Sequence, residues 1–275
     1  MKKYPIGLQL YSVRSDLYKD FEGTLKAVAE MGYEGVEFAG LYGKSAKEVR
    51  KLCAKYGLAP VSAHVALSEM EAEPEKTFET YKEIGCRYIA VPYLGDAERP
   101  GHENYDRTVE SIARLAEKSK EYGLQMMYHN HDFEFVRMAN GLYGYDDLFA
   151  RVPADLLTCE IDICWVKVAG EDPAGYLQKY KDRIPVVHFK DYYKKGDKNE
   201  NLYSLIGMEE KEKADEADFS FKPLGCGMQN LPGLLSALDG TNCAWIIVEQ
   251  DEPSDGRSRS ECAKISIDNL KKLMK

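Results

Sequence analysis

The stretch E-Y-G-L-Q-M-M-Y-H-N-H, residues 121–131, contains the unit that is repeated along this chain. A helical segment ends at Gly123, an apolar run typical of a strand follows, and the run ends in polar side chains. Glycine suits this position because the residue after the last helical turn often adopts a positive φ, which costs glycine no steric strain. The same order of glycine and apolar run occurs at Gly32, Gly57 and Gly85.

Eight apolar runs of strand type can be counted, and helical segments separate them. They lie at residues 6–11, 35–38, 60–65, 87–92, 124–129, 156–162, 184–189 and 244–249. Strands that alternate with helices predict a parallel sheet, and eight units in 275 residues suit a (β/α)8 barrel. We therefore predict an α/β fold, a single-domain TIM barrel over residues 1–275. A doubly wound sheet is the alternative, but Gly225-Cys-Gly227 lacks the third glycine of a G-x-G-x-x-G turn.

The composition argues against several classes of protein. The chain has 37 basic and 46 acidic residues, a net charge of -9, which disfavours nucleic-acid binding because that requires a basic face. No apolar stretch approaches the roughly 18 residues of a membrane helix, and residues 1–16 are typical of a first strand rather than a signal peptide. Seven cysteines without a C-x-x-C pair predict reduced thiols in a cytoplasmic protein.

The segment 191–222 differs from the other connections because it is long and highly charged. It would follow the seventh strand, on the barrel face where active sites lie. We expect either a solvated surface loop or a lid over the site, and the sequence leaves both open.

The alternation of side chains along a strand predicts which residues point into the barrel. In C-E-I-D-I-C, residues 159–164, the polar Glu160 and Asp162 share the inner face. In V-V-H-F-K-D, residues 186–191, His188 and Lys190 do so, and Glu160 is expected to pair with Lys190 or with another strand. The other inward polar residues expected near strand ends are Gln9, Tyr11, Glu37, His64, His129, His131 and Glu249.

Four of these residues come from the ends of different late strands and combine two imidazoles with two carboxylates. This donor set suits one divalent ion, Mn²⁺, Co²⁺, Mg²⁺ or Zn²⁺. The predicted metal ligands are His129, Asp162, His188 and Glu249. Beyond the fifth strand, Asp132 and Glu134 are expected to shape the loop, with Glu134 solvated.

Six motifs together resemble the xylose isomerase-like barrels of the sugar phosphate isomerase/epimerase family. They are QLYSVR (9–14), GYEGVEF (32–38), EIDICWV (160–166), HFKD (188–191), PLGCG (223–227) and VEQ (248–250). The resemblance implies one metal ion held by Glu, Asp, His and Glu from strands 5 to 8. Asp162, His188 and Glu249 match three of these ligands, and His129 stands where the first glutamate would be. Trp165 replaces a histidine that contacts the substrate in the keto-sugar epimerases.

The activity that the resemblance implies is metal-dependent isomerisation or epimerisation of a small sugar or keto-sugar through an enediolate, with phosphorylation of the substrate left open. Glu249 or His131 would move the proton. The residues expected to contact substrate are Tyr11, Glu37, His64, Trp165 and Lys190, with Glu37 alternatively a partner of a ligand. No other partner is expected beyond a homo-oligomer, which the sequence leaves open.

Three alternatives remain at this point. Because only one of the two metal-bound glutamates of the epimerases is present, a one-base elimination like that of the related inosose dehydratases is the second activity. A sugar-binding protein with a decayed metal site is the third reading. An apurinic-site endonuclease is the fourth, but that branch uses three metal ions and more ligands than five histidines supply.

Overall fold

The structure is a computed structural model that describes residues 3–196, 202–203, 207 and 218–275. Eight parallel strands close into a barrel in the order β1-β10-β7-β6-β5-β4-β3-β2. The barrel strands are β1 (Ile6–Gln9), β2 (Gly35–Ala39), β3 (Ala59–His64), β4 (Tyr88–Val91), β5 (Gln125–His129), β6 (Leu157–Asp162), β7 (Val186–Phe189) and β10 (Trp245–Val248). The predicted (β/α)8 barrel is confirmed, and each predicted strand has its counterpart.

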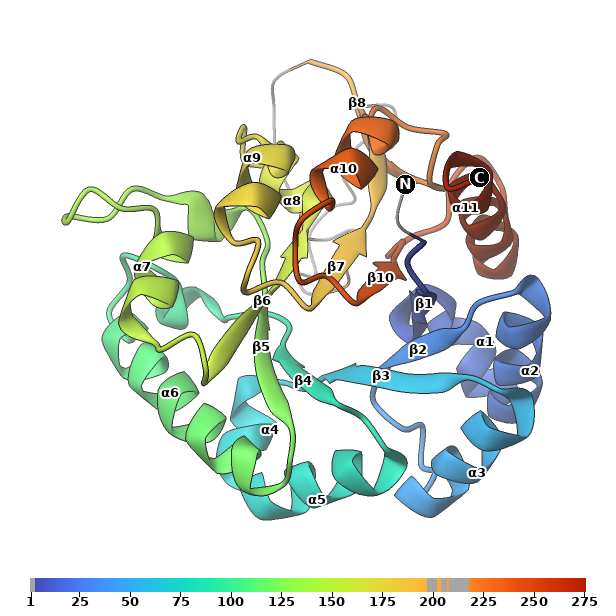
Figure 1. Cartoon of the computed structure of the whole chain (residues 1–275), viewed down its shortest axis with the longest axis horizontal. Helices are drawn as coiled ribbons and strands as arrows, with labels where there is room; N and C mark the ends of the chain where they lie inside the picture. The colour runs from blue at the N-terminus through green and yellow to red at the C-terminus, as the bar shows by residue number, and fades with distance from the viewer. Residues whose placement is uncertain (1–2, 197–201, 204–206, 208–217) are drawn as a thin grey trace.

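Helices surround the barrel on its outside (Figure 1). The α-helices are α1 (Arg14–Lys19), α2 (Phe21–Met31), α3 (Ala46–Tyr56), α4 (Leu67–Ala72), α5 (Pro74–Ile84), α6 (Tyr105–Glu121), α7 (Gly144–Arg151), α8 (Ile163–Val168), α9 (Pro173–Lys179), α10 (Leu231–Ala237) and α11 (Arg259–Leu273). Short 3-10 helices are η1 (Leu10–Val13), η2 (Asp96–Glu98) and η3 (Phe133–Phe135). Within the described residues, no helix has the length and apolarity needed to cross a membrane.

The two faces of the strands follow the predicted alternation. Outward residues such as Ile161, Val187 and Phe189 belong to the apolar layer between the strands and the helices. Inside the barrel, a separate cluster that includes Met127 and Ile247 fills the interior. This packed interior closes the barrel below its polar end, so a site can form only at the mouth.

The structure corrects two expectations about the path of the chain, besides shifts of one or two residues at the ends of the other strands. The first strand ends at Gln9 and not at residue 11, because the Gln9 side chain accepts a hydrogen bond from the Tyr11 N–H and starts the turn of η1. The segment 191–222 is not a plain loop, because its ends pair as the antiparallel strands β8 (Asp191–Lys194) and β9 (Phe219–Lys222). Most of the residues between these two strands lie outside the described part of the chain, and the lid that was predicted for them stays a prediction.

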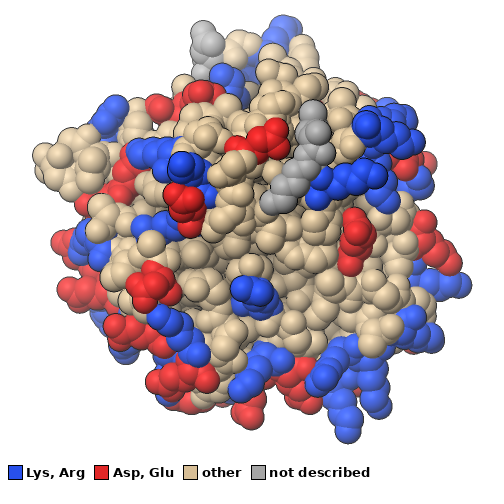
Figure 2. All heavy atoms as spheres, viewed as in Figure 1, with Lys and Arg blue, Asp and Glu red and all other residues tan. Residues whose placement is uncertain are grey.

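The surface carries charges of both signs. Figure 2 shows basic and acidic side chains interleaved around the margin of one face, with a mostly uncharged centre. Interleaved charge of this kind gives no extended basic groove on that face, in line with the net charge of -9.

Candidate active site

The polar ends of the barrel strands meet at one mouth, around a cavity of about 230 Å³. Its walls are formed by Tyr11, Ala39, His64, Pro92, Tyr93, His129, His131, Lys190, Glu249 and Asp251. A larger hollow of about 540 Å³ lies at the outer surface beside Tyr18 and Tyr42. The barrel mouth is the better candidate because imidazoles, carboxylates and an ammonium group converge there.

The four predicted metal ligands lie together in the structure. One donor atom from each of His129, Asp162, His188 and Glu249 falls within 4.8 Å of all the others, and all four side chains are buried. Asp162 uses Oδ1 to accept hydrogen bonds from the backbone N–H of Cys164 and Trp165, at 2.7 and 3.1 Å, which caps α8. Its other oxygen is thereby directed into the cluster, as a ligand oxygen would be.

Both imidazoles of this set have a further carboxylate behind them. His188 directs Nδ1 at Glu249, 3.1 Å away, while its Nε2 lies 2.7 Å from Glu37. His129 directs Nε2 toward Asp162, and its Nδ1 lies 3.4 Å from Glu160. Histidine ligands of metal ions commonly donate their second N–H to such a carboxylate, which fixes the tautomer and the ring orientation. The four donor side chains, together with the carboxylates of Glu37 and Glu160 behind the two imidazoles, therefore fit a divalent ion.

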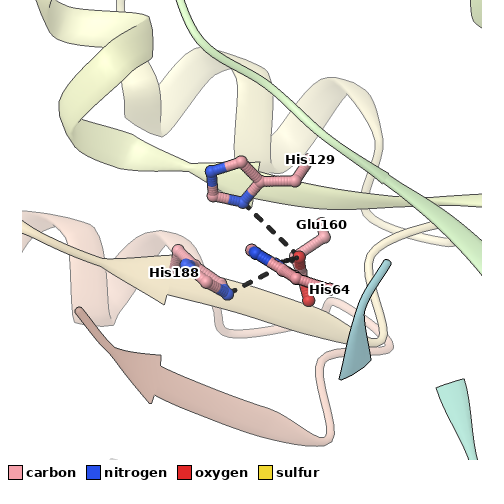
Figure 3. A group of neighbouring side chains, drawn as sticks. All are labelled: His64, His129, Glu160 and His188. Atoms are coloured by element: carbon pink, nitrogen blue, oxygen red, sulfur yellow. Dashed lines mark hydrogen bonds and ion pairs between the residues drawn. The ribbon is translucent and has the colours of Figure 1, made fainter. Parts of the chain in front are cut away.

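A second, deeper cluster shares two of these residues. Figure 3 shows His64, His129 and His188 around the carboxylate of Glu160, and donor atoms of the four also lie within 4.8 Å of one another. Glu160 lies 2.6 Å from His64 Nε2, so it pairs with another strand rather than with Lys190. Three imidazoles with one carboxylate could also hold a cation.

Lys190 occupies the centre of the acidic side of the mouth. Its ammonium lies 3.2 Å from Asp162, 2.7 Å from Glu249 and 2.9 Å from Asp251, and its side chain is 1% exposed. Burial opposes the charge, but the three carboxylates outweigh it and hold the pKa of Lys190 well above its usual value. Lys190 is therefore a permanent cation and not a base.

The imidazoles differ in their electrostatic surroundings. Burial lowers the pKa of His129 to about 4 and lowers that of His131 well below its ordinary value. Burial acts in the same direction on His188, but the charges of Glu37 and Glu160 outweigh it and raise the pKa of His188. His129 and His131 are therefore neutral at neutral pH, the form in which an imidazole binds metal or accepts a proton.

His131 lies in a frame of aromatic rings. Its ring centroid is 5.7 Å from that of Phe133, with the planes stacked, and 5.0 Å from that of Trp165. Tyr93 and Tyr203 complete the frame, at 5.2 and 6.2 Å. Tyr203 lies in the segment 191–222 and donates a hydrogen bond to Asp132, so this described residue of the segment reaches the site. His131 Nδ1 has no hydrogen-bond partner among the described residues.

The other predicted site residues occupy different depths. Tyr11, His64 and Lys190 line the cavity. Glu37 is fully buried beneath it and accepts hydrogen bonds from Gln9 and Ser62 as well as contacting His188, the position of a partner to a ligand. Trp165 is also fully buried and lies behind His131 and Lys190.

Two features of the site were missed or misjudged from the sequence. Asp251 lies beyond the last strand, where strand alternation no longer applies, yet it lines the cavity and pairs with Lys190. Glu134 is not solvated: it is 1% exposed and accepts hydrogen bonds from the Tyr128 hydroxyl and the His131 N–H, at 2.8 and 2.9 Å. Its role in shaping the loop is confirmed, and burial raises its pKa to about 8.

A family model described as xylose isomerase-like TIM barrel matches residues 25–273. The chain belongs to the xylose isomerase-like TIM barrel family. A similar curated relative is an inosose dehydratase of Lacticaseibacillus casei, 25% identical over an alignment 258 positions long that covers 84% of this chain and 82% of that protein.

Two solved structures share the fold of this family member. A sugar phosphate isomerase/epimerase from Parabacteroides distasonis superposes with a TM-score of 0.79 at 23% identity, covering 99% of this chain and all of that one. The IOLI protein, whose structure contains a zinc atom, superposes with a TM-score of 0.73 at 14% identity, covering 98% and 97% of the two chains.

Proposed function

We propose that this protein is a metal-dependent lyase that removes water from a keto-sugar, with His131 as the group that moves the proton. The observation that carries the proposal is the pairing, at one mouth, of a four-residue donor set with the imidazole of His131, which lines the cavity and belongs to neither donor cluster. The relatives named inosose dehydratase support a dehydration.

The metal ion would be held by His129, Asp162, His188 and Glu249. When bound, it supplies a positive charge that stabilises the oxyanion formed as a carbonyl compound enolises. The outer set is preferred over the deeper cluster because it has two carboxylates, and because Glu160 in the deeper cluster already faces three imidazoles. Glu249 is better suited to the ligand role than to that of a base. Burial opposes its charge, but the Lys190 ammonium and the His188 imidazole hold its pKa well below the usual range.

His131 would take the proton from the carbon next to the carbonyl. Its imidazole lines the cavity and is neutral. The backbone N–H of His131 donates to the Glu134 carboxylate, which fixes the position of the residue. The imidazolium formed exchanges its proton with solvent. It then either returns a proton to the carbon or protonates the hydroxyl on the next carbon, which leaves as water while a carbon–carbon double bond forms. One proton carrier is enough for this sequence, and Lys190 stays a cation held by its carboxylates at the cavity wall.

Aldose–ketose isomerisation is the second candidate, because it uses the same enolisation and also needs one proton carrier. Isomerases and epimerases occur among the fold neighbours. Epimerisation by two carboxylates on opposite faces of the substrate is disfavoured, since His129 replaces one of them.

Solvent exchange would test the proposal. Metal-loaded protein would be incubated in D₂O with an inosose and with unmodified ketoses, and the carbon-bound deuterium and the products would be read by NMR. The proposal predicts deuterium uptake together with an unsaturated ketone, both lost in His131→Ala. Deuterium uptake with an isomeric sugar would instead identify an isomerase, and no uptake with any ketone would contradict enolisation.

A further inference from the structure

We infer that the cavity accepts only substrates without a phosphate or carboxylate group, that is, an uncharged polyhydroxy ketone. This inference rests on the proposed function and narrows its substrate class. Three independent features of the mouth support it. Its cations are already paired with carboxylates, the backbone N–H groups of a nearby loop already donate to a carboxylate, and carboxylates outnumber cations.

The first feature is that the cations around the cavity are already bound. Among the described residues that line it, Lys190 is the only lysine or arginine, and its ammonium faces three carboxylates at 2.7 to 3.2 Å. A phosphate would have to replace one of these buried partners. Breaking such a buried pair leaves a charge without compensation, which is costly.

Two arginines near the mouth, Arg14 and Arg99, also have hydrogen-bond and ion-pair partners within the protein. Arg14 stacks on the Tyr11 ring, donates to the Asp251 carbonyl at 2.6 Å and pairs with Glu252. Arg99 packs over the Phe133 ring and pairs with Asp96 at 2.6 Å. Neither guanidinium offers the two parallel N–H groups that bind a phosphate in the usual fork.

The second feature is the glycine-containing loop before α10. In TIM barrels the loops after the last two strands frequently bind phosphate through backbone N–H groups. Here the Asp191 carboxylate accepts hydrogen bonds from the N–H groups of Gly225, Gly227 and Gln229, each at 3.0 Å, and from that of Tyr192. A side chain of the protein therefore fills the place that a phosphate would take.

The third feature is the charge beneath the cavity. Glu249 and Asp251 line it, and three further buried carboxylates, Glu37, Glu160 and Asp162, lie directly below. A divalent ion offsets two of these five charges, Lys190 a third, and the His64 imidazole, which lies 3.1 Å from Glu37 and 2.6 Å from Glu160, at most a fourth. An anionic substituent would enter a low-dielectric site whose field already repels it.

The remaining surfaces suit a neutral ring. Tyr11, Pro92 and Tyr93 give apolar walls, and His64 and His131 supply hydrogen-bonding groups. His131 is 5% exposed and framed by aromatic rings, a setting that favours a hydrogen bond to a hydroxyl over contact with an anion.

Paired ligands would test the inference by isothermal titration calorimetry on the metal-loaded protein. The probes are an inosose, D-fructose and D-ribulose, the phosphates of the two ketoses, and inorganic phosphate as a competitor. We expect at least one neutral ketone to bind, with each ketose phosphate weaker than its parent by about tenfold or more and no competition from inorganic phosphate. A phosphate ester that binds more tightly than its parent, or a panel in which no neutral ketone binds, would overturn the inference.

A matched pair of variants sharpens the test. Asp251→Asn removes one of the three carboxylates around Lys190, so the difference in binding affinity between a ketose and its phosphate should become smaller. Asp255→Asn removes a carboxylate that pairs with Lys222 and Arg257 at the surface, and should leave the difference unchanged. An equal response of both variants would contradict the role of Lys190.

The failure of this inference can be distinguished from that of the proposed function. Binding of neutral ketones without deuterium exchange would contradict the lyase but support the uncharged substrate. Turnover of a phosphorylated ketone with exchange would support enolisation and overturn the uncharged substrate.

Discussion

Replacing Lys190 by methionine should destabilise the metal-free protein by about 3–5 kcal/mol at pH 7, the usual cost of removing one partner from a buried ion pair. Methionine keeps much of the apolar length of the side chain and removes the ammonium, which lies over the Trp165 and Phe221 rings at 5.6 and 5.4 Å, so the change acts mainly on charge. The loss arises because Asp162, Glu249 and Asp251 all lie within 3.2 Å of the ammonium and are left without it.

The pH dependence of the variant follows from the same carboxylates. Burial raises the pKa of Asp251 to about 6 even with Lys190 present, and removing the ammonium raises it further. A folded-state pKa above the unfolded value means that the folded variant binds more protons than the unfolded chain below this pKa. The loss of unfolding free energy in Lys190→Met should therefore shrink as the pH falls toward about 6, the pKa of Asp251 in the wild type. Added Zn²⁺ should also reduce this loss.

Urea unfolding followed by circular dichroism would measure this loss, with Lys264→Met as the matched control. Lys264 also pairs with a carboxylate, that of Asp268 at 2.5 Å, but both side chains are nearly half exposed. Exposed pairs contribute little, so the control should hardly move the unfolding midpoint. Equal midpoints for the two variants at pH 7 would refute the electrostatic role assigned to Lys190.

Three further predictions concern stability and thiol access. Asp191→Ala should cost about 2–4 kcal/mol in urea unfolding because it leaves the N–H groups of the loop before α10 without their acceptor, whereas Asp191→Asn, which keeps one acceptor oxygen, should cost less. Because the pKa of Glu134 is raised to about 8, this residue should lower stability progressively as the pH rises from about 4.5 to 8. The melting temperature of Glu134→Gln should therefore depend less on pH than that of the wild type. Identical pH profiles of the two melting temperatures would contradict the pKa shift. The seven cysteines all lie in the described residues, form no disulfide, and only Cys226 is exposed, so a thiol reagent should label one cysteine rapidly in the native protein and seven in denaturant; several fast thiols would contradict the packing.

Strand alternation predicted the parts of the site that lie on strands. A period of two places Glu160 with Asp162 and His188 with Lys190, and all four side chains are indeed buried at the mouth. The eight strands could be located for the same reason, since each is an apolar run next to a turn signal.

The parts that could not be predicted lie where the backbone leaves the strand. Asp251 and Glu134 follow strand ends, and no periodicity tells whether such a residue turns inward or toward solvent. Tyr203 is far from His131 in the sequence, and its contact with the site depends on the path of the segment 191–222. The hydrogen bond that starts η1 at Gln9 is likewise a tertiary detail of one side chain.

The metal content of the purified protein tests the central claim most directly. Elemental mass spectrometry would be applied to wild type, His129→Ala and His131→Ala, all prepared without chelator or added metal. Our account predicts about one divalent ion per chain in the wild type and in His131→Ala, and its loss in His129→Ala. Absence of metal from the wild type even after reconstitution, or equal metal content in both variants, would contradict the metal site.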